Sequence, residues 1–292
     1  MFSGAMTAMI TPFAGGSVDE GRLREQVEYQ IAGGISGLVP VGTTGESPTL
    51  DFKEHERVIE LTVKYAGGRV PVIGGTGGNA TTEALELHGF AKKAGCTACL
   101  SVIPYYNKPS QEGMYRHFMT LADKVDLPIV LYNIPGRTGV TMSAQTVARL
   151  RKANPKAFVA IKEATGSIDM TSEIMSLCDV TVLSGDDSLT LPLMSLGATG
   201  VVSVLSNLLP DVVSRLAKLA LAGNFEDAAA IHHRYYPLMR AMFLDGNPVG
   251  IKFAMQHAGR DSGQLRLPLC EASEPTKKQI ADLMAKLDVK RA

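Results

Sequence analysis

Runs of apolar, often β-branched residues recur along the first two thirds of this chain, and a stretch with helical periodicity follows most of them. The runs are mostly continuous and do not alternate with polar residues, which is typical of parallel strands covered on both faces. They predict eight strands, at residues 5–10, 37–41, 70–74, 98–104, 128–132, 158–162, 180–184 and 200–204.

The stretches between these strands begin with residues that favour helix starts. Asp51 and Glu54 have the spacing of a capping box, Ser143 precedes a second helical stretch, and Asn79 and Thr81 stand at the start of a third. Eight strand–helix units in one uninterrupted series predict an α/β fold, the (β/α)8 or TIM barrel, over residues 1–222.

After the eighth predicted strand the pattern is only helical. Helices are predicted at residues 211–222, 225–244, 248–257 and 276–287. A barrel unit needs one helix, so residues 223–292 are predicted to form a small helical extension. No low-complexity linker precedes it, and we expect it to pack on the barrel.

The composition argues against several classes of partner. In 292 residues, Lys and Arg total 29, Asp and Glu total 29, and no block of like charge occurs. This balance disfavours nucleic acid or an anionic membrane surface as a partner. No apolar stretch is long enough for a membrane span, and the first residues lack the features of a signal peptide, so a cytoplasmic protein is expected.

Two short motifs imitate metal or cofactor sites. Cys96 and Cys99 form a Cys-x-x-Cys pair, but no second pair or spaced histidines accompany it. Strand alternation would send the two thiols to opposite faces, and we predict buried structural cysteines. Gly75 and Gly77 follow a strand as in a dinucleotide-binding loop, yet the next strand ends without an acid for a ribose. The two aspartates after the seventh strand have no histidine cluster beside them, so neither a cofactor nor a metal is predicted.

Lys162 is unusual because it lies inside the apolar run 158–164. Burying an ammonium is costly unless a carboxylate pairs with it or its pKa falls far enough to leave a neutral amine. One interpretation is a lysine at a strand end that reaches solvent or pairs with an acid. The other is a desolvated nucleophile for Schiff-base chemistry on a carbonyl compound, with Ala160 and Ala164 on the same strand face leaving room for a small substrate.

Other candidate groups fall at the ends of predicted strands, where the active sites of barrels form. An amine nucleophile, a phenol for proton transfer and a cation for a carboxylate suit carbonyl chemistry on a small acid. Each residue alone also suits a turn, core packing or a solvated charge, and their common position on one rim favours a site. They are Thr43, Thr44, Tyr105, Tyr106, Tyr132, Arg137 and Gly185.

The motifs at these strand ends resemble the 4-hydroxy-tetrahydrodipicolinate synthase family, formerly called the dihydrodipicolinate synthase family, of the pyruvate-dependent class I aldolases and lyases. The resemblance extends over essentially the whole chain. Its motifs are GTTGES at 42–47, PYYNKPSQEG at 104–113, YNIPGRTG at 132–139, IKEATG at 161–166 and LSGDD at 183–187.

This resemblance implies a cofactor-independent lyase that condenses pyruvate with L-aspartate-4-semialdehyde in diaminopimelate and lysine biosynthesis. Lys162 would form the Schiff base with pyruvate. Tyr132 would move protons in a hydroxyl relay with Thr43 and with Tyr106, which in this family reaches in from a neighbouring subunit. The usual assembly of the family is a homotetramer, a dimer of dimers.

The resemblance also implies which residues bind the substrates. Thr44 and the backbone at Val202 would hold pyruvate, with Gly185 as a further substrate-binding residue, and Arg137 would bind the carboxylate of the semialdehyde. N-acetylneuraminate lyases and keto-deoxy-sugar-acid aldolases share the lysine and the tyrosine, although Arg137 and the second threonine of GTTGE favour the synthase. A catalytically silent barrel that senses a small acid is a further alternative, since fold alone does not exclude it.

Members of the family that L-lysine inhibits have an effector site whose residues match Ser47, His55, Asn79, Glu83 and Tyr105. This chain departs from them at Pro48, where they have a small residue, and at Phe52, where they have a histidine. Proline has no backbone N–H, and phenylalanine cannot make the hydrogen bond of an imidazole. We therefore predict that L-lysine inhibits this protein weakly or not at all.

Overall fold

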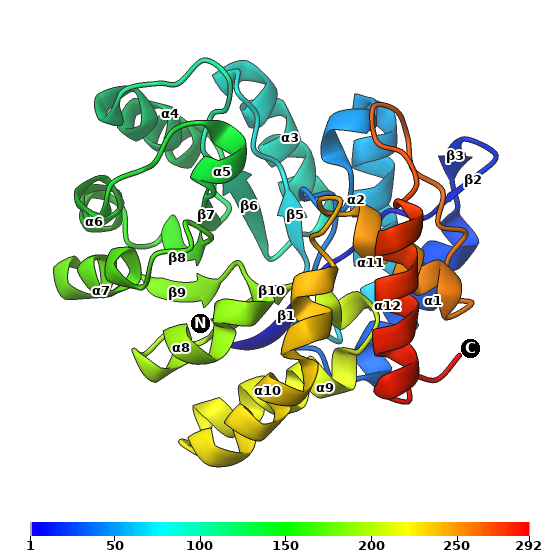
Figure 1. Cartoon of the computed structure of the whole chain (residues 1–292). Coiled ribbons are helices and arrows are strands. Elements are labelled where there is room, and N and C mark those ends of the chain that lie inside the picture. Colours follow the sequence, from blue (N-terminus) through cyan, green and yellow to red (C-terminus); the bar gives the residue numbers. More distant parts are fainter. Residues whose placement is uncertain (1, 292) are drawn as a thin grey trace.

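Eight parallel strands form the centre of the structure, a computed structural model that describes residues 2–291. They are β1 (Gly4–Ala8), β4 (Gly37–Val39), β5 (Ile73–Gly75), β6 (Ala98–Val102), β7 (Ile129–Asn133), β8 (Phe158–Glu163), β9 (Thr181–Ser184) and β10 (Gly200–Ser203). Their order in the sheet is β4-β1-β10-β9-β8-β7-β6-β5, and a bridge between Leu38 and Val72 joins the two ends. The sheet therefore closes, and the predicted (β/α)8 barrel is confirmed (Figure 1).

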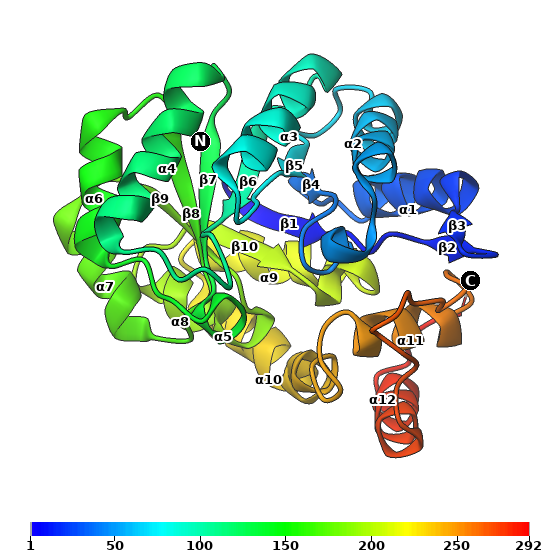
Figure 2. The same cartoon turned by 90° about the horizontal axis from the view of Figure 1, so that it is seen from above.

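Helices alternate with the strands and surround the barrel (Figure 2). Asp51 accepts a hydrogen bond from the Glu54 N–H at 2.8 Å and completes the predicted capping box of α2, and Ser143 caps α6. α3 begins at Thr81, as predicted, although Ala80 holds its cap position and no side chain bonds there. The helices are α1 (Glu20–Ala32), α2 (Phe52–Ala66), α3 (Thr81–Ala94), α4 (Gln111–Lys124), α5 (Pro135–Thr138), α6 (Ala144–Ala153), α7 (Ile168–Leu177), α8 (Thr190–Ser195) and α9 (Pro210–Leu221), with short 3-10 turns η1 (Ser47–Thr49), η2 (Asp187–Leu189) and η3 (Leu205–Asn207).

A small antiparallel hairpin was not predicted. It pairs β2 (Phe13–Ala14) with β3 (Ser17–Val18). Gly15 and Gly16 connect the two strands with φ values of 59° and 84°, a conformation that glycine adopts without steric cost. Strands of two residues are too short to show an apolar pattern.

The predicted C-terminal helices are present as α10 (Phe225–Ala241), α11 (Val249–His257) and α12 (Glu274–Lys286). α10 packs against α8 and α9, α11 contacts η3, and α12 packs on α10 and α11. The extension therefore lies against the barrel, as Figures 1 and 2 show. The boundary between residues 222 and 223 stays a prediction.

Buried apolar side chains form two layers. One fills the barrel interior with alternate residues of each strand, among them Val130, Tyr132, Ala160 and Leu183. The other lies between the strands and the helices. Parallel strands that are apolar on both faces explain why the sequence shows continuous runs.

Cys96 and Cys99 are both buried in this outer layer, so the predicted burial is confirmed. Their predicted placement on opposite faces is wrong, because Cys96 precedes β6 and strand alternation does not apply to it. Burial raises the pKa of the Cys96 thiol to about 11, and it also raises the pKa of Cys99. Raised thiol pKa values favour the inert thiol form over the reactive thiolate.

Candidate active site

Lys162 lies on β8 and is 5% exposed. Of the described lysines, Lys252 forms a fully buried ion pair with Glu46, whereas Lys162 forms none. Its sequence neighbour Glu163 accepts a hydrogen bond from the Thr165 N–H at 2.7 Å, and burial raises the pKa of that carboxyl. The interpretation of Lys162 as a solvent-exposed or acid-paired lysine is therefore wrong, and its interpretation as a desolvated nucleophile stays a prediction.

Tyr132 and Gly185 lie against this lysine. Tyr132 is the partner of Lys162 in the β7–β8 pairing, and it is 4% exposed. The Lys162 Nζ lies 4.2 Å from the centre of the Tyr132 ring. A Cβ atom on Gly185 would lie 3.2 Å from Lys162 Cε and 2.6 Å from Ala164 Cβ. Glycine at 185 therefore leaves the space that the lysine side chain occupies.

Thr44 and Arg137 are joined through a residue of the C-terminal extension, Asn247. The Asn247 Nδ2 donates to Thr44 Oγ1 at 3.0 Å, and the Arg137 Nη2 donates to the Asn247 carbonyl at 2.9 Å. Asn247 is buried, and its Oδ1 has no hydrogen-bond partner within residues 2–291. Asn247 lies between the helices predicted at residues 225–244 and 248–257, and no local signal in the sequence distinguishes it from other loop residues.

The remaining predicted residues occupy different surroundings. Val202 is buried in the barrel interior, in the same cluster as Tyr132. Thr43 is half-buried next to Thr44, and its carbonyl accepts a hydrogen bond from Glu46. Tyr106 is 89% exposed, with a left-handed φ of 71°.

The predicted hydroxyl relay is not present within one chain. Among the described residues, no hydrogen bond joins the Tyr132 hydroxyl to Thr43 or Tyr106, and the Tyr106 side chain is exposed to solvent. A relay through Tyr106 would require a second copy of the chain.

A separate cavity of about 110 Å³ brings together most residues of the predicted effector site. Its lining includes Ser47, His55, Glu83 and Tyr105, together with Pro48 and Phe52, whereas Asn79 does not line it. The His55 Nε2 donates to the Gly75 carbonyl at 2.6 Å, and burial lowers the pKa of this imidazole. Burial and the nearby Glu83 raise the pKa of Tyr105.

The motifs that imitate cofactor and metal sites have structural explanations. A Cβ on Gly75 would lie 2.3 Å from the Val41 carbonyl oxygen, so this glycine lets the end of β5 pack closely against the segment that follows β4. Asp186 caps η2, and Asp187 accepts hydrogen bonds from the N–H groups of Val204 and Leu205 at 2.9 Å each. Within residues 2–291, no group of three or more His, Cys, Asp or Glu is arranged to hold a metal ion. None of the helices described is long and apolar enough to span a membrane.

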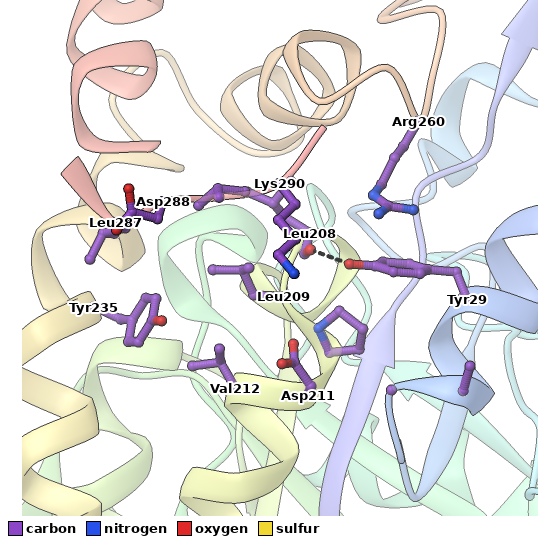
Figure 3. Close-up of a pocket in the computed structure, with 14 residues that line it drawn as sticks. Tyr29, Leu208, Leu209, Asp211, Val212, Tyr235, Arg260, Leu287, Asp288 and Lys290 are labelled. Atoms are coloured by element: carbon purple, nitrogen blue, oxygen red, sulfur yellow. Dashed lines mark hydrogen bonds between the residues drawn. The ribbon is translucent and has the colours of Figure 1, made fainter. Parts of the chain in front are cut away.

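A cavity of about 420 Å³ lies away from these residues, between α1, the start of α9 and the last residues of the described chain (Figure 3). Tyr29 donates a hydrogen bond to the Leu208 carbonyl at 2.8 Å there, and the Arg260 guanidinium lies 3.9 Å from the centre of the Tyr29 ring. None of the predicted site residues lines this cavity.

Comparison with known proteins gives consistent matches over nearly the full length. The model of the dihydrodipicolinate synthetase family matches residues 1–287. The 4-hydroxy-tetrahydrodipicolinate synthase of Geotalea daltonii is 50% identical over 286 residues, which cover 97% of this chain and 98% of that protein. The dihydrodipicolinate synthase of Aquifex aeolicus has a TM-score of 0.97 and 45% identity, with 99% of each chain covered. The chloride-inhibited dihydrodipicolinate synthase of Acinetobacter baumannii, complexed with pyruvate, has a TM-score of 0.96 and 38% identity, with 99% of this chain and 100% of that chain covered.

Proposed function

The chain belongs to the dihydrodipicolinate synthetase family, and we propose that it condenses pyruvate with L-aspartate-4-semialdehyde through a Schiff base on Lys162. Full-length relatives named 4-hydroxy-tetrahydrodipicolinate synthase make it a lyase of diaminopimelate and lysine biosynthesis, in preference to the N-acetylneuraminate lyase and sugar-acid aldolase alternatives. The observation that carries the proposal for Lys162 is its burial without a carboxylate partner, against the Tyr132 ring.

The chemistry follows from a desolvated amine. The Lys162 amine attacks the ketone carbon of pyruvate, and loss of water leaves an imine. Removal of a methyl proton converts the imine into an enamine, whose carbon attacks the aldehyde of the second substrate. The amino group of that substrate then attacks the imine carbon, closes the ring and releases the Lys162 amine.

Each step moves a proton, and Tyr132, whose ring lies against the Lys162 amine, would move it. Thr44, Gly185 and the backbone at Val202 would bind pyruvate, and Arg137 would bind the carboxylate of the semialdehyde. Arg137 is exposed, and among residues 2–291 its guanidinium bonds only to the Asn247 carbonyl, which leaves N–H groups available for a ligand.

The position of Tyr106 supports an oligomeric enzyme. A tyrosine that is 89% exposed in a left-handed conformation contributes little to its own barrel. Tyr106 would complete the hydroxyl relay of Thr43 and Tyr132 in a neighbouring subunit, and the proposed assembly is a homotetramer. A biosynthetic enzyme that acts on small soluble metabolites is expected in the cytoplasm.

Borohydride reduction in the presence of pyruvate tests the proposal. Reduction of the imine should attach one pyruvate-derived group to the chain, and peptide mass spectrometry should locate it on Lys162. Lys162→Met is the control and should remain unlabelled. Label on another lysine, or no label on the native chain, would contradict the mechanism. A turnover assay with the semialdehyde then separates the synthase from sugar-acid aldolases, which would also be labelled.

A further inference from the structure

Glu46 ends the loop that carries Thr43 and Thr44, in a conformation that is uncommon for a residue with a side chain. Its φ is 56°, and Val41, which begins the loop, has a φ of 48°. Left-handed φ values are rare outside glycine and are real outliers for a β-branched residue such as valine. Such conformations persist only where surrounding contacts hold them.

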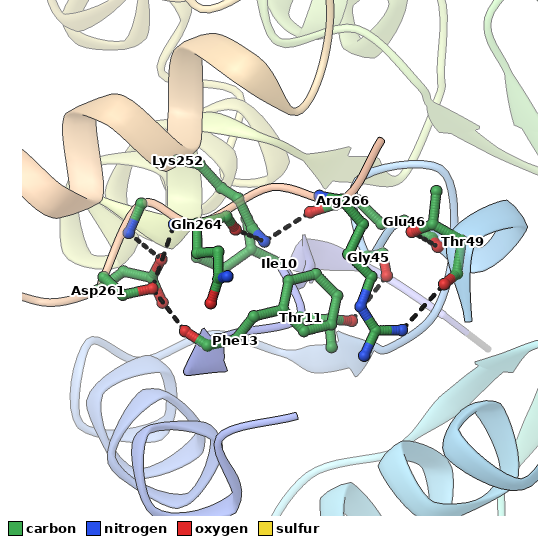
Figure 4. A network of polar contacts seen from close by, with 12 residues as sticks. Ile10, Thr11, Phe13, Gly45, Glu46, Thr49, Lys252, Asp261, Gln264 and Arg266 are labelled. Atoms are coloured by element: carbon green, nitrogen blue, oxygen red, sulfur yellow. Dashed lines mark hydrogen bonds and ion pairs between the residues drawn. The ribbon is translucent and has the colours of Figure 1, made fainter. Parts of the chain in front are cut away.

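The contacts that hold Glu46 come from the C-terminal part of the chain (Figure 4). Lys252 on α11 is fully buried, and its Nζ lies 2.5 Å from Glu46 Oε1 and 2.7 Å from the Gln264 carbonyl. The backbone N–H of Arg266 donates to Glu46 Oε2 at 3.2 Å. Both carboxylate oxygens of Glu46 therefore contact residues more than 200 positions away in the sequence.

The ring of Phe13 completes the surroundings of this ion pair. The Lys252 Nζ lies 4.1 Å from the ring centre, and the Arg266 guanidinium lies 4.3 Å from it. The guanidinium also donates to both oxygens of Glu54 at 2.6 Å each and to the Thr49 carbonyl at 2.9 Å. Lys252 and Arg266 of the C-terminal part of the chain thus contact Glu46, and Arg266 also bonds the turn η1 that follows it.

Hydrogen bonds connect Glu46 and the C-terminal part of the chain to the two threonines. The Glu46 N–H donates to the Thr43 carbonyl at 3.1 Å, and Asn247 of the same C-terminal segment donates to Thr44 Oγ1 at 3.0 Å. A shift of the Glu46 carboxylate would therefore move the backbone that carries both hydroxyl groups.

We infer that the Glu46–Lys252 ion pair positions Thr43 and Thr44 for pyruvate, so that the C-terminal helices form part of the functional site. The inference rests on the proposed function, because it assigns the two threonines to the pyruvate site. Stability alone does not explain the pair, since replacing a buried ion pair by apolar residues of similar volume is often neutral or stabilising. Glu46 and Lys252 are thus positioning residues that act through the threonines.

Glu46→Gln tests this role because it keeps the shape of the side chain and removes its charge. We expect kcat/KM for pyruvate and the rate of borohydride trapping to fall by about tenfold or more, since small misplacements of binding groups have effects of this size. Lys252→Met should change the same two quantities. The double variant has neither buried charge, so it should fold even if a single variant does not, and it should show the same kinetic loss.

Leu238→Ala is the matched control. Leu238 is fully buried in α10, a helix that carries none of the residues bonded to Glu46, so this variant should lower the unfolding temperature and leave the pyruvate kinetics within about twofold of the native values. The positioning role is wrong if kcat/KM for pyruvate falls equally in Leu238→Ala and Glu46→Gln. It is also wrong if Glu46→Gln and the double variant keep the native kcat/KM for pyruvate. If the variants give either of these results while borohydride still traps pyruvate on Lys162 of the native chain, only the positioning role is wrong and the proposed function stands. An untrapped native chain would overturn the proposed function and this inference together.

Discussion

The Nζ of Lys162 lies 4.2 Å from the centre of the Tyr132 ring, and the two residues are direct partners in the parallel strands β7 and β8. Both side chains are at least 95% buried. The strand pairing places the Lys162 amine over the face of the Tyr132 ring, and no carboxylate of residues 2–291 forms an ion pair with it. The proposed nucleophile and the proposed proton-transfer group therefore share one buried site.

Tyr132→Phe should separate the chemical role of the phenol from its packing role. The ring and its contact with Lys162 remain, and within residues 2–291 the hydroxyl makes no hydrogen bond whose loss would weaken the fold. Loss of a positioned acid–base group lowers rates by about 10²- to 10⁴-fold, and we expect a fall of this size in kcat with an unchanged unfolding temperature. Tyr115→Phe on α4 is the control and should leave turnover unchanged. A rate for Tyr132→Phe within about threefold of native would show that the phenol is structural.

Arg137→Ala should act mainly on the second substrate. The guanidinium is exposed and anchored to the Asn247 carbonyl, so it is free to meet a carboxylate. Loss of a hydrogen bond to a charged group costs about 1.5–3 kcal/mol, which corresponds to a rise in KM for the semialdehyde of about tenfold or more. Trapping of pyruvate on Lys162 should survive. Arg149→Ala, which removes an exposed ion pair with Glu112, should change neither quantity, and unaltered semialdehyde kinetics in Arg137→Ala would favour a sugar-acid substrate.

L-lysine should inhibit weakly or not at all. Pro48 and Phe52 both line the cavity that Ser47, His55 and Glu83 share, so the two departures from sensitive relatives lie where a ligand would bind. Glu83 remains to pair with an ammonium group, but one or two hydrogen bonds to a bound L-lysine would be missing. Each missing bond costs about 1.5–3 kcal/mol, so affinity should fall by about tenfold or more.

A velocity titration with L-lysine measures this directly. The double variant Pro48→Ala/Phe52→His restores the side chains of sensitive relatives and should gain inhibition. Tight and complete inhibition of the native chain would mean that Pro48 and Phe52 are neutral substitutions.

Acid should destabilise the protein through two buried histidines. The His88 Nδ1 donates to the Ala84 carbonyl, His117 Nδ1 bonds with Thr81 Oγ1, and neither Nε2 has a partner in the described chain. Burial lowers the pKa of each imidazole to about 4. The unfolded state, with a pKa near 6.5, takes up these protons first, so stability falls as the pH drops from about 6.5 towards 4.

The size of the effect is roughly 3 kcal/mol for one histidine, from the difference between pKa values of 6.5 and about 4. His88→Leu removes one such group, and the free energy of unfolding should then depend less on pH over this range. His233→Gln changes an exposed histidine of α10 and serves as the control. Identical pH profiles for native and His88→Leu proteins would show that His88 does not contribute.

The sequence by itself determined the barrel and pointed to the main group of candidate site residues. Continuous apolar runs placed all eight strands within a few residues, because parallel strands buried on both faces leave a pattern that is local in the chain. Lys162, Tyr132 and Arg137 were visible because an apolar strand with a lysine, and strand ends with a phenol or a guanidinium, are local signals. Local rules failed at Cys96, which lies just outside its strand.

Only the tertiary structure decided what surrounds these groups. Asn247 contacts Thr44, and Lys252 contacts Glu46, across about 200 residues of sequence. The sequence around these residues contains no pattern that predicts either contact. The hydrogen bonds of a turn asparagine and the partner of a helix lysine depend on which distant backbone packs against them. Burial of the Lys162 amine without an acid likewise became visible only once the barrel was closed around it, because the sequence shows charges but not the distances between them.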